Sequence, residues 1–68
     1  MNNLTKREKD VAKLITLGLS NRQIAKKLCI SVHTVKANLE HIYDKLGFSN
    51  RVLLAIYFIK HNNNINSL

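Results

Sequence analysis

The sequence contains no proline, no tryptophan, two glycines and a single cysteine. One cysteine cannot form an internal disulfide or a cysteine-based zinc site, which argues against a small secreted domain and favours a reducing compartment. No run of about 18 apolar residues is present, and residues 1–10 lack the apolar segment of a signal peptide. We therefore expect a soluble, cytoplasmic protein with no membrane-spanning segment.

Acidic residues are also scarce. The 68 residues include 4 Asp or Glu against 11 Lys or Arg, which gives a formal net charge of +7. A chain of this length forms one small domain, whose compact core leaves no room for a large substrate cavity. Excess positive charge on so small a surface favours a polyanionic partner, because Lys and Arg that neutralise phosphates release bound counterions. Charge alone does not distinguish nucleic acid from an anionic membrane.

Capping boxes mark the starts of two helices. Thr5 is followed three residues later by Glu8, so that each side chain can bond the backbone N–H of the other residue. This pair predicts a first helix over about residues 6–17. Ser20 and Gln23 repeat the spacing and predict a second helix of about two turns, too short to be stable alone.

Two further helices are expected in the second half of the chain. Ser31 and Gly47 bound a segment with the N-cap and C-terminal residues of a helix. Its apolar residues recur at intervals of four, three and four: Val35, Leu39, Ile42 and Leu46. The apolar run 52–59 fits a buried strand or a helix by periodicity alone, and its context after Ser49 or Asn50 favours a helix.

The expected fold is all-α, a four-helix bundle that contains a helix-turn-helix. We assign residues 1–61 to the domain and residues 62–68 to a frayed polar tail, because the tail has too little apolar surface to offset its ordering entropy. The small side chain of Ala25 allows the second and third helices to approach closely. Cys29 lies in the turn, where such motifs often have glycine, and a positive φ there costs about 1–2 kcal/mol.

Four stretches of the sequence, in this order and spacing, resemble the NarL/FixJ/LuxR-type DNA-binding domain. They are LTKREKDV (4–11), GLSNRQIAKKL (18–28), ISVHTVKANLEHIYDKLG (30–47) and NR (50–51). In that family the third helix enters the DNA major groove, and the fourth helix forms the dimer on DNA. The resemblance therefore implies a sequence-specific transcriptional regulator that binds double-stranded DNA and is not an enzyme.

The third helix and the start of the second carry the candidate DNA contacts. By the resemblance, Lys36, Ala37 and Glu40 read bases, since they match guanine acceptors, the thymine methyl group and the cytosine N4 donor respectively. The candidate phosphate contacts are Asn21, Arg22, Thr34, Lys36, Asn38 and Lys45. His33 and His41 lie on the same exposed side of the third helix. Asn38 stands where family members commonly have His, which removes a possible positive charge. The alternative is that these residues form an ordinary solvated surface.

The fourth helix is more apolar than one core requires. Leu54, Ala55 and Phe58 share one face, which we expect to point inward. Four further apolar side chains form the candidate dimer surface: Val52, Leu53, Ile56 and Tyr57. A two-fold dimer would place two recognition helices about 34 Å apart and read an inverted repeat. The alternative is that the tail or another domain covers this surface, and Leu53 departs from the acidic or amide residue common in the family.

No combination of residues indicates catalysis or metal binding. The four acidic residues offer no carboxylate pair protected from water, and Cys29 and His33 are separated by a turn and a helix cap. We expect no catalytic residue, metal site, cofactor or small-molecule ligand in this domain. We also expect Arg51 to form an ion pair with Glu8 that ties the fourth helix to the first.

Three other functions compete with the LuxR-type interpretation. A region-4-like module of a sigma factor shares much of the pattern, but KLGFSNR (45–51) followed by an apolar helix argues against it. A protein-interaction module would dock its basic face on an acidic partner or on RNA polymerase. A membrane-surface helix is the least supported, because only Arg51 and Lys60 flank the apolar run.

Overall fold

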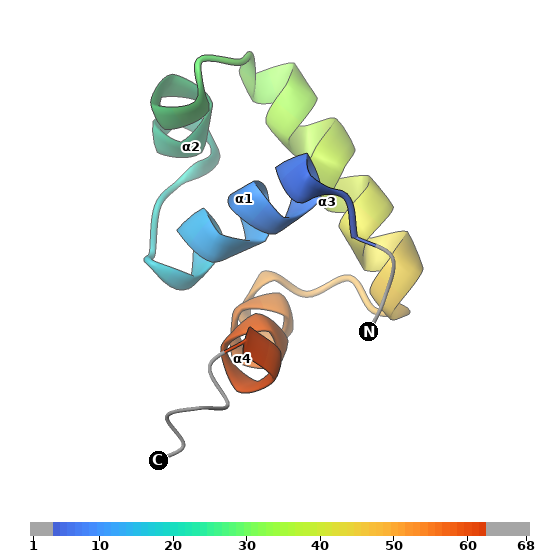
Figure 1. The fold of residues 1–68 in the computed structure, drawn as a ribbon. Helices are drawn as coiled ribbons and strands as arrows, with labels where there is room; N and C mark the ends of the chain where they lie inside the picture. Colours follow the sequence, from blue (N-terminus) through green and yellow to red (C-terminus); the bar gives the residue numbers. More distant parts are fainter. Residues whose placement is uncertain (1–3, 63–68) are drawn as a thin grey trace.

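The computed structural model describes residues 4–62 and consists, over that range, of helices and short connections with no strand. The helices are α1 (Lys6–Thr16), α2 (Asn21–Leu28), α3 (Val32–Leu46) and α4 (Arg51–Asn62). Figure 1 shows α1 between the α2–α3 pair and α4, with α2 and α3 joined by a tight turn. The predicted all-α, four-helix fold with a helix-turn-helix is therefore confirmed.

Both predicted capping boxes are present. The backbone N–H of Thr5 donates to Glu8 Oε1 at 2.9 Å, and the N–H of Glu8 donates to Thr5 Oγ1 at 3.1 Å. Ser20 and Gln23 make the same reciprocal bonds at 2.8 and 3.2 Å. Each box satisfies two groups that a helix start otherwise leaves without partners, so these local sequence signals determine where α1 and α2 begin.

The boundaries of α3 and α4 are also set by single residues. Ser31 Oγ accepts from the N–H three residues later at 3.0 Å, and Gly47 follows α3 with a φ of 83°. Asn50 Oδ1 accepts from the N–H of Val52 at 2.9 Å, so α4 has a side-chain cap at its start. The ambiguous run 52–59 is a helix. It continues to Asn62, and the part of the expected tail from residue 63 onward lies outside the described residues.

The core is built around α1, which packs against both α3 and α4, while α2 packs mainly against α3. The largest fully buried side chains are Val11, Ile24, Val35, Ile42 and Leu54. Full burial of a side chain of this size contributes about 1.5–3 kcal/mol relative to leaving it exposed. Since these side chains come from all four helices, each helix is held by tertiary packing, including the short α2.

Candidate nucleic-acid interface

The turn between α2 and α3 contains a residue in the left-handed backbone conformation. Cys29 adopts the left-handed conformation, with φ 58° and ψ 44°, and it is the non-glycine residue with positive φ in the described chain. The N–H of Ile30 donates to the carbonyl of Ala25 at 2.9 Å and closes the end of α2. Ala25 and Val35 are buried where the helices meet. Packing thus supports a backbone conformation that costs about 1–2 kcal/mol in a residue with a Cβ.

α3 has a buried side and a polar exposed side. Val35, Leu39 and Ile42 are buried against the core. The exposed side carries most of the candidate DNA contacts of this helix, namely His33, Thr34, Lys36, Glu40 and His41. The two intermediate positions are Ala37 and Asn38, and the Asn38 side-chain Nδ2 donates to the Thr34 carbonyl at 2.9 Å. α2 adds the exposed cations Arg22, Lys26 and Lys27.

A buried carboxylate on α1 holds the middle and end of α3. Glu8 is 3% exposed. Its Oε1 accepts from Lys45 Nζ at 2.7 Å, and its Oε2 lies 3.8 Å from His41 Nδ1. Burial by itself raises the pKa of Glu8, but the hydrogen bonds from Lys45 and Thr5 and the nearby positive charges outweigh it, so the pKa is lowered. Two residues expected to face DNA, Lys45 and His41, therefore also orient α3 against α1.

The expected ion pair between Glu8 and Arg51 is wrong, since the described partners of Glu8 are the cap and the two α3 side chains. Arg51 instead donates through Nη1 to Asn21 Oδ1 at 2.7 Å and through Nη2 to the Leu19 carbonyl at 2.8 Å. Arg51 begins α4, and this places its guanidinium nearer to the start of α2 than to the buried carboxylate. The fourth helix is thus tied to the second.

The outward side of α4 is strongly apolar. Val52 is 66% exposed, while Leu53 and Ile56 are each 49% exposed, as expected for these three candidate dimer residues. Tyr57 is half-buried, and its ring stacks on His61 with centroids 4.0 Å apart. Ile59, which the sequence analysis did not select, is 46% exposed. Leu54 and Phe58 are buried on the opposite side as expected, while Ala55, the third residue expected to point inward, is half-buried.

A comparison with known protein families decides what this helix-turn-helix is. The sequence pattern of the family described as "Bacterial regulatory proteins, luxR family" matches residues 2–58. The chain belongs to the luxR family. This membership confirms that the chain is the expected DNA-binding domain of a transcriptional regulator, and this domain is not an enzyme. It also favours the LuxR-type interpretation over the sigma-factor alternative.

Relatives of this luxR-family chain are regulators from several bacteria. It is 42% identical over 57 residues to the nitrate/nitrite response regulator protein NarL of Escherichia coli K12 and 44% identical over 57 residues to the oxygen regulatory protein NreC of Staphylococcus aureus. Each alignment covers 84% of this chain and 26% of the relative. An HTH-type transcriptional regulator of Mycobacterium bovis is 50% identical over 52 residues, which are 76% of this chain and 6% of the relative. The chain therefore spans a minor part of these relatives.

In this luxR-family domain the tertiary structure brings together residues that the sequence analysis treated separately. Asn21, expected to contact phosphate, is bonded to Arg51. Lys45 is bonded to Glu8. Ile59 was missed although it follows Val52 by seven residues and Ile56 by three, a helical spacing that places the three on one face. None of the described helices is long and apolar enough to cross a bilayer.

Proposed function

We propose that this luxR-family domain binds DNA by placing the exposed side of α3 in the major groove. The observation that carries the proposal is the polarity of α3, because one side is fixed in the core by three buried residues and the other presents a cation, a small apolar side chain and a carboxylate. Lys36 donates to guanine O6 or N7, Ala37 contacts a thymine methyl group, and Glu40 accepts from cytosine N4. These three base edges are distinct in the major groove, so the set specifies sequence.

The surrounding polar residues position the domain on the phosphates. Asn21 and Arg22 open α2, and Thr34 lies in the first turn of α3. Side chains and N–H groups at helix starts are favourable donors to phosphate oxygens. The remaining proposed phosphate contacts are Lys36, Asn38 and Lys45. His33 and His41 are further candidate DNA contacts on the exposed side of α3. The formal net charge of +7 adds a sequence-independent attraction that weakens as salt rises.

The apolar side of α4 is the proposed dimer surface. Val52, Leu53 and Ile56 are large, exposed and adjacent on one helix, with half-buried Tyr57 beside them. Contiguous exposed apolar side chains of this kind mark interaction sites. A two-fold dimer through α4 presents two copies of α3 about 34 Å apart and binds an inverted repeat. The names of the relatives, which describe response and transcriptional regulators, support a role in the control of transcription.

Selection from a random double-stranded DNA pool at about 150 mM salt tests the proposal, because that concentration screens weak phosphate attraction. The expected product is an enriched inverted repeat with half-sites about one helical turn apart. Binding without enrichment, lost as salt rises, would refute sequence-specific reading and favour docking on RNA polymerase or another acidic partner. Lys26→Ala is the matched control, since this exposed cation is not assigned to a base and should leave the enriched sequence unchanged.

A further inference from the structure

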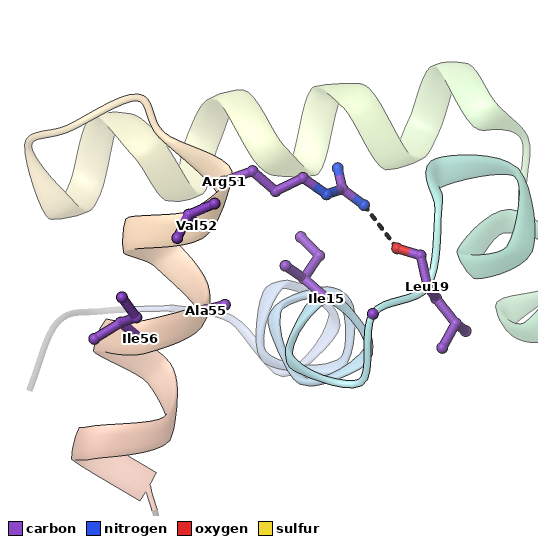
Figure 2. A pocket seen from close by; sticks show the side chains of 7 residues that line it. Ile15, Leu19, Arg51, Val52, Ala55 and Ile56 are labelled. Carbon is purple, nitrogen blue, oxygen red and sulfur yellow. Dashed lines mark hydrogen bonds between the residues drawn. The ribbon is translucent and has the colours of Figure 1, made fainter.

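Arg51 links α4 to the start of α2 through two short hydrogen bonds. Nη2 donates to the Leu19 carbonyl at 2.8 Å, and Nη1 donates to Asn21 Oδ1 at 2.7 Å. Figure 2 shows the side chain extending from the first turn of α4, past Ile15, to the Leu19 carbonyl. Leu19 and Asn21 flank Ser20, the N-cap of α2. The guanidinium therefore holds the segment on both sides of this cap.

Apolar packing alone does not fix this junction. A hollow of about 280 Å³ lies between the α1–α2 connection and α4, lined by Ile15, Gly18, Leu19, Val52, Ala55 and Ile56, with Arg51 at its edge. α2 is only eight residues long and packs mainly on α3. The planar fork of an Arg side chain bonds two acceptors in one geometry, so it can set the position of the helix start that borders this hollow.

The bond also determines which way the Asn21 amide faces. A guanidinium has only donors, so the group that meets Arg51 must be the carbonyl oxygen of Asn21. The Nδ2 group is then directed away from the guanidinium. Among the described residues Nδ2 has no hydrogen-bond partner, and it is not a buried unsatisfied atom. Asn21 thus offers two N–H donors and no free carbonyl oxygen at the start of α2.

We propose that Arg51 is a positioning residue for DNA binding. It orients the Asn21 amide so that Nδ2 donates a hydrogen bond to a DNA phosphate. The inference rests on the proposed function, because it deepens the phosphate contact assigned there to Asn21. With its oxygen held by Arg51, the amide presents N–H groups to a phosphate oxygen. Without Arg51 the amide can rotate and present its oxygen, which a phosphate repels. Arg51 therefore acts on DNA affinity from α4, through Asn21, without contacting DNA itself.

A double-mutant cycle on the selected operator tests this coupling. Asn21→Ala and Arg51→Lys should each weaken binding about fivefold on operator and random DNA alike, the loss of about one hydrogen bond. Lysine keeps the positive charge but cannot bond both acceptors in the fork geometry. The double variant should bind no more weakly than Asn21→Ala alone. Arg7→Lys is the matched control, since this exposed arginine lies on α1 and pairs with Asp10. This variant should bind DNA with the same affinity as the wild type.

Asn21→Asp separates the two roles of this residue, which are to accept a hydrogen bond from Arg51 and to donate one to a DNA phosphate. The carboxylate still accepts from Arg51, so the thermal midpoint should not fall, but the N–H donors are replaced by negative charge. Binding should weaken more than tenfold. All affinities are measured at a temperature where circular dichroism shows every variant fully folded.

The outcomes distinguish the two proposals. A double variant about 25-fold weaker, the product of independent losses, would assign Arg51 a role apart from Asn21 and overturn the inference while leaving DNA binding intact. Wild-type-like binding by Asn21→Asp would also overturn it. If the wild-type chain binds no DNA, the proposed function fails and the inference fails with it.

Discussion

Lys45→Met removes the ammonium group that faces Glu8 and keeps most of the apolar length of the side chain. Lys45 Nζ lies 2.7 Å from Glu8 Oε1, and the side chains are 33% and 4% exposed respectively. Breaking a fully buried ion pair by removing one partner costs about 3–5 kcal/mol. Because Lys45 is partly exposed and Glu8 keeps its hydrogen bond from the N–H of Thr5, we expect a smaller effect. The free energy of unfolding should fall by about 1–3 kcal/mol, which is typical of a hydrogen bond to a charged group.

The loss should depend on pH in a defined direction. The pKa of Glu8 in the folded protein is lowered from its ordinary value of 4.5, against the opposing effect of burial. The ionised carboxylate therefore stabilises the fold above the unfolded pKa, and this stability is lost as pH falls through the folded pKa. In Lys45→Met the burial remains while the ammonium is gone, so the pKa of Glu8 rises. The deficit in the free energy of unfolding relative to the wild type should be largest at neutral pH. It should shrink as pH falls from the raised pKa of Glu8 in the variant toward its lowered pKa in the wild type.

Urea unfolding followed by circular dichroism at 222 nm, at about pH 7 and about pH 3.5, measures this deficit. Lys36→Met is the matched control, because Lys36 is exposed on the same helix and has no described ion-pair partner; it should change the free energy of unfolding by less than about 0.5 kcal/mol. An equal deficit at both pH values would refute the electrostatic explanation and assign the loss to packing of the lysine stem.

Three further substitutions test separate parts of the structure. Lys36→Ala should cost about 1–3 kcal/mol in specific binding and relax the preference at one base pair in a repeated selection, whereas an equal loss on all sequences would indicate a phosphate contact. Ile56→Glu should leave the domain folded and abolish cooperative occupancy of two half-sites in a gel-shift titration, and an unfolded variant would show that Ile56 supports the core. Cys29→Gly should raise the free energy of unfolding by about 0.5–1 kcal/mol, because relief of the left-handed strain exceeds the entropy that glycine adds to the unfolded chain; a lower denaturation midpoint would contradict this.

Helix boundaries were predictable because capping is local. Thr5 and Glu8, or Ser20 and Gln23, are three residues apart, and the bonds between them need no information from the rest of the chain. The buried side of α3 was also predictable, because one helical period places its apolar residues together. The periodicity of the run 52–59 did not distinguish a strand from a helix, and its context after Ser49 or Asn50 correctly favoured a helix.

The choice of partner for each long charged side chain was not predictable from sequence. Glu8 has cations both 37 and 43 positions away, at Lys45 and Arg51, and no spacing rule separates them. α1 packs against both α3 and α4, and the side chain that reaches Glu8 Oε1 is Lys45 of α3, with its Nζ at 2.7 Å. Arg51 lies instead at the start of α4, within reach of Asn21.

The sequence by itself therefore determined the first three helices, their caps and the inward face of α3, since these arise from contacts or periodicities within a few residues. It also carried the luxR-type pattern. Only the tertiary structure decided that Lys45 pairs with Glu8 and that Arg51 holds Asn21. The physical reason is that a lysine or arginine side chain can reach several neighbours. Which one it meets depends on the angles and offsets between helices, which the packing of the whole core sets.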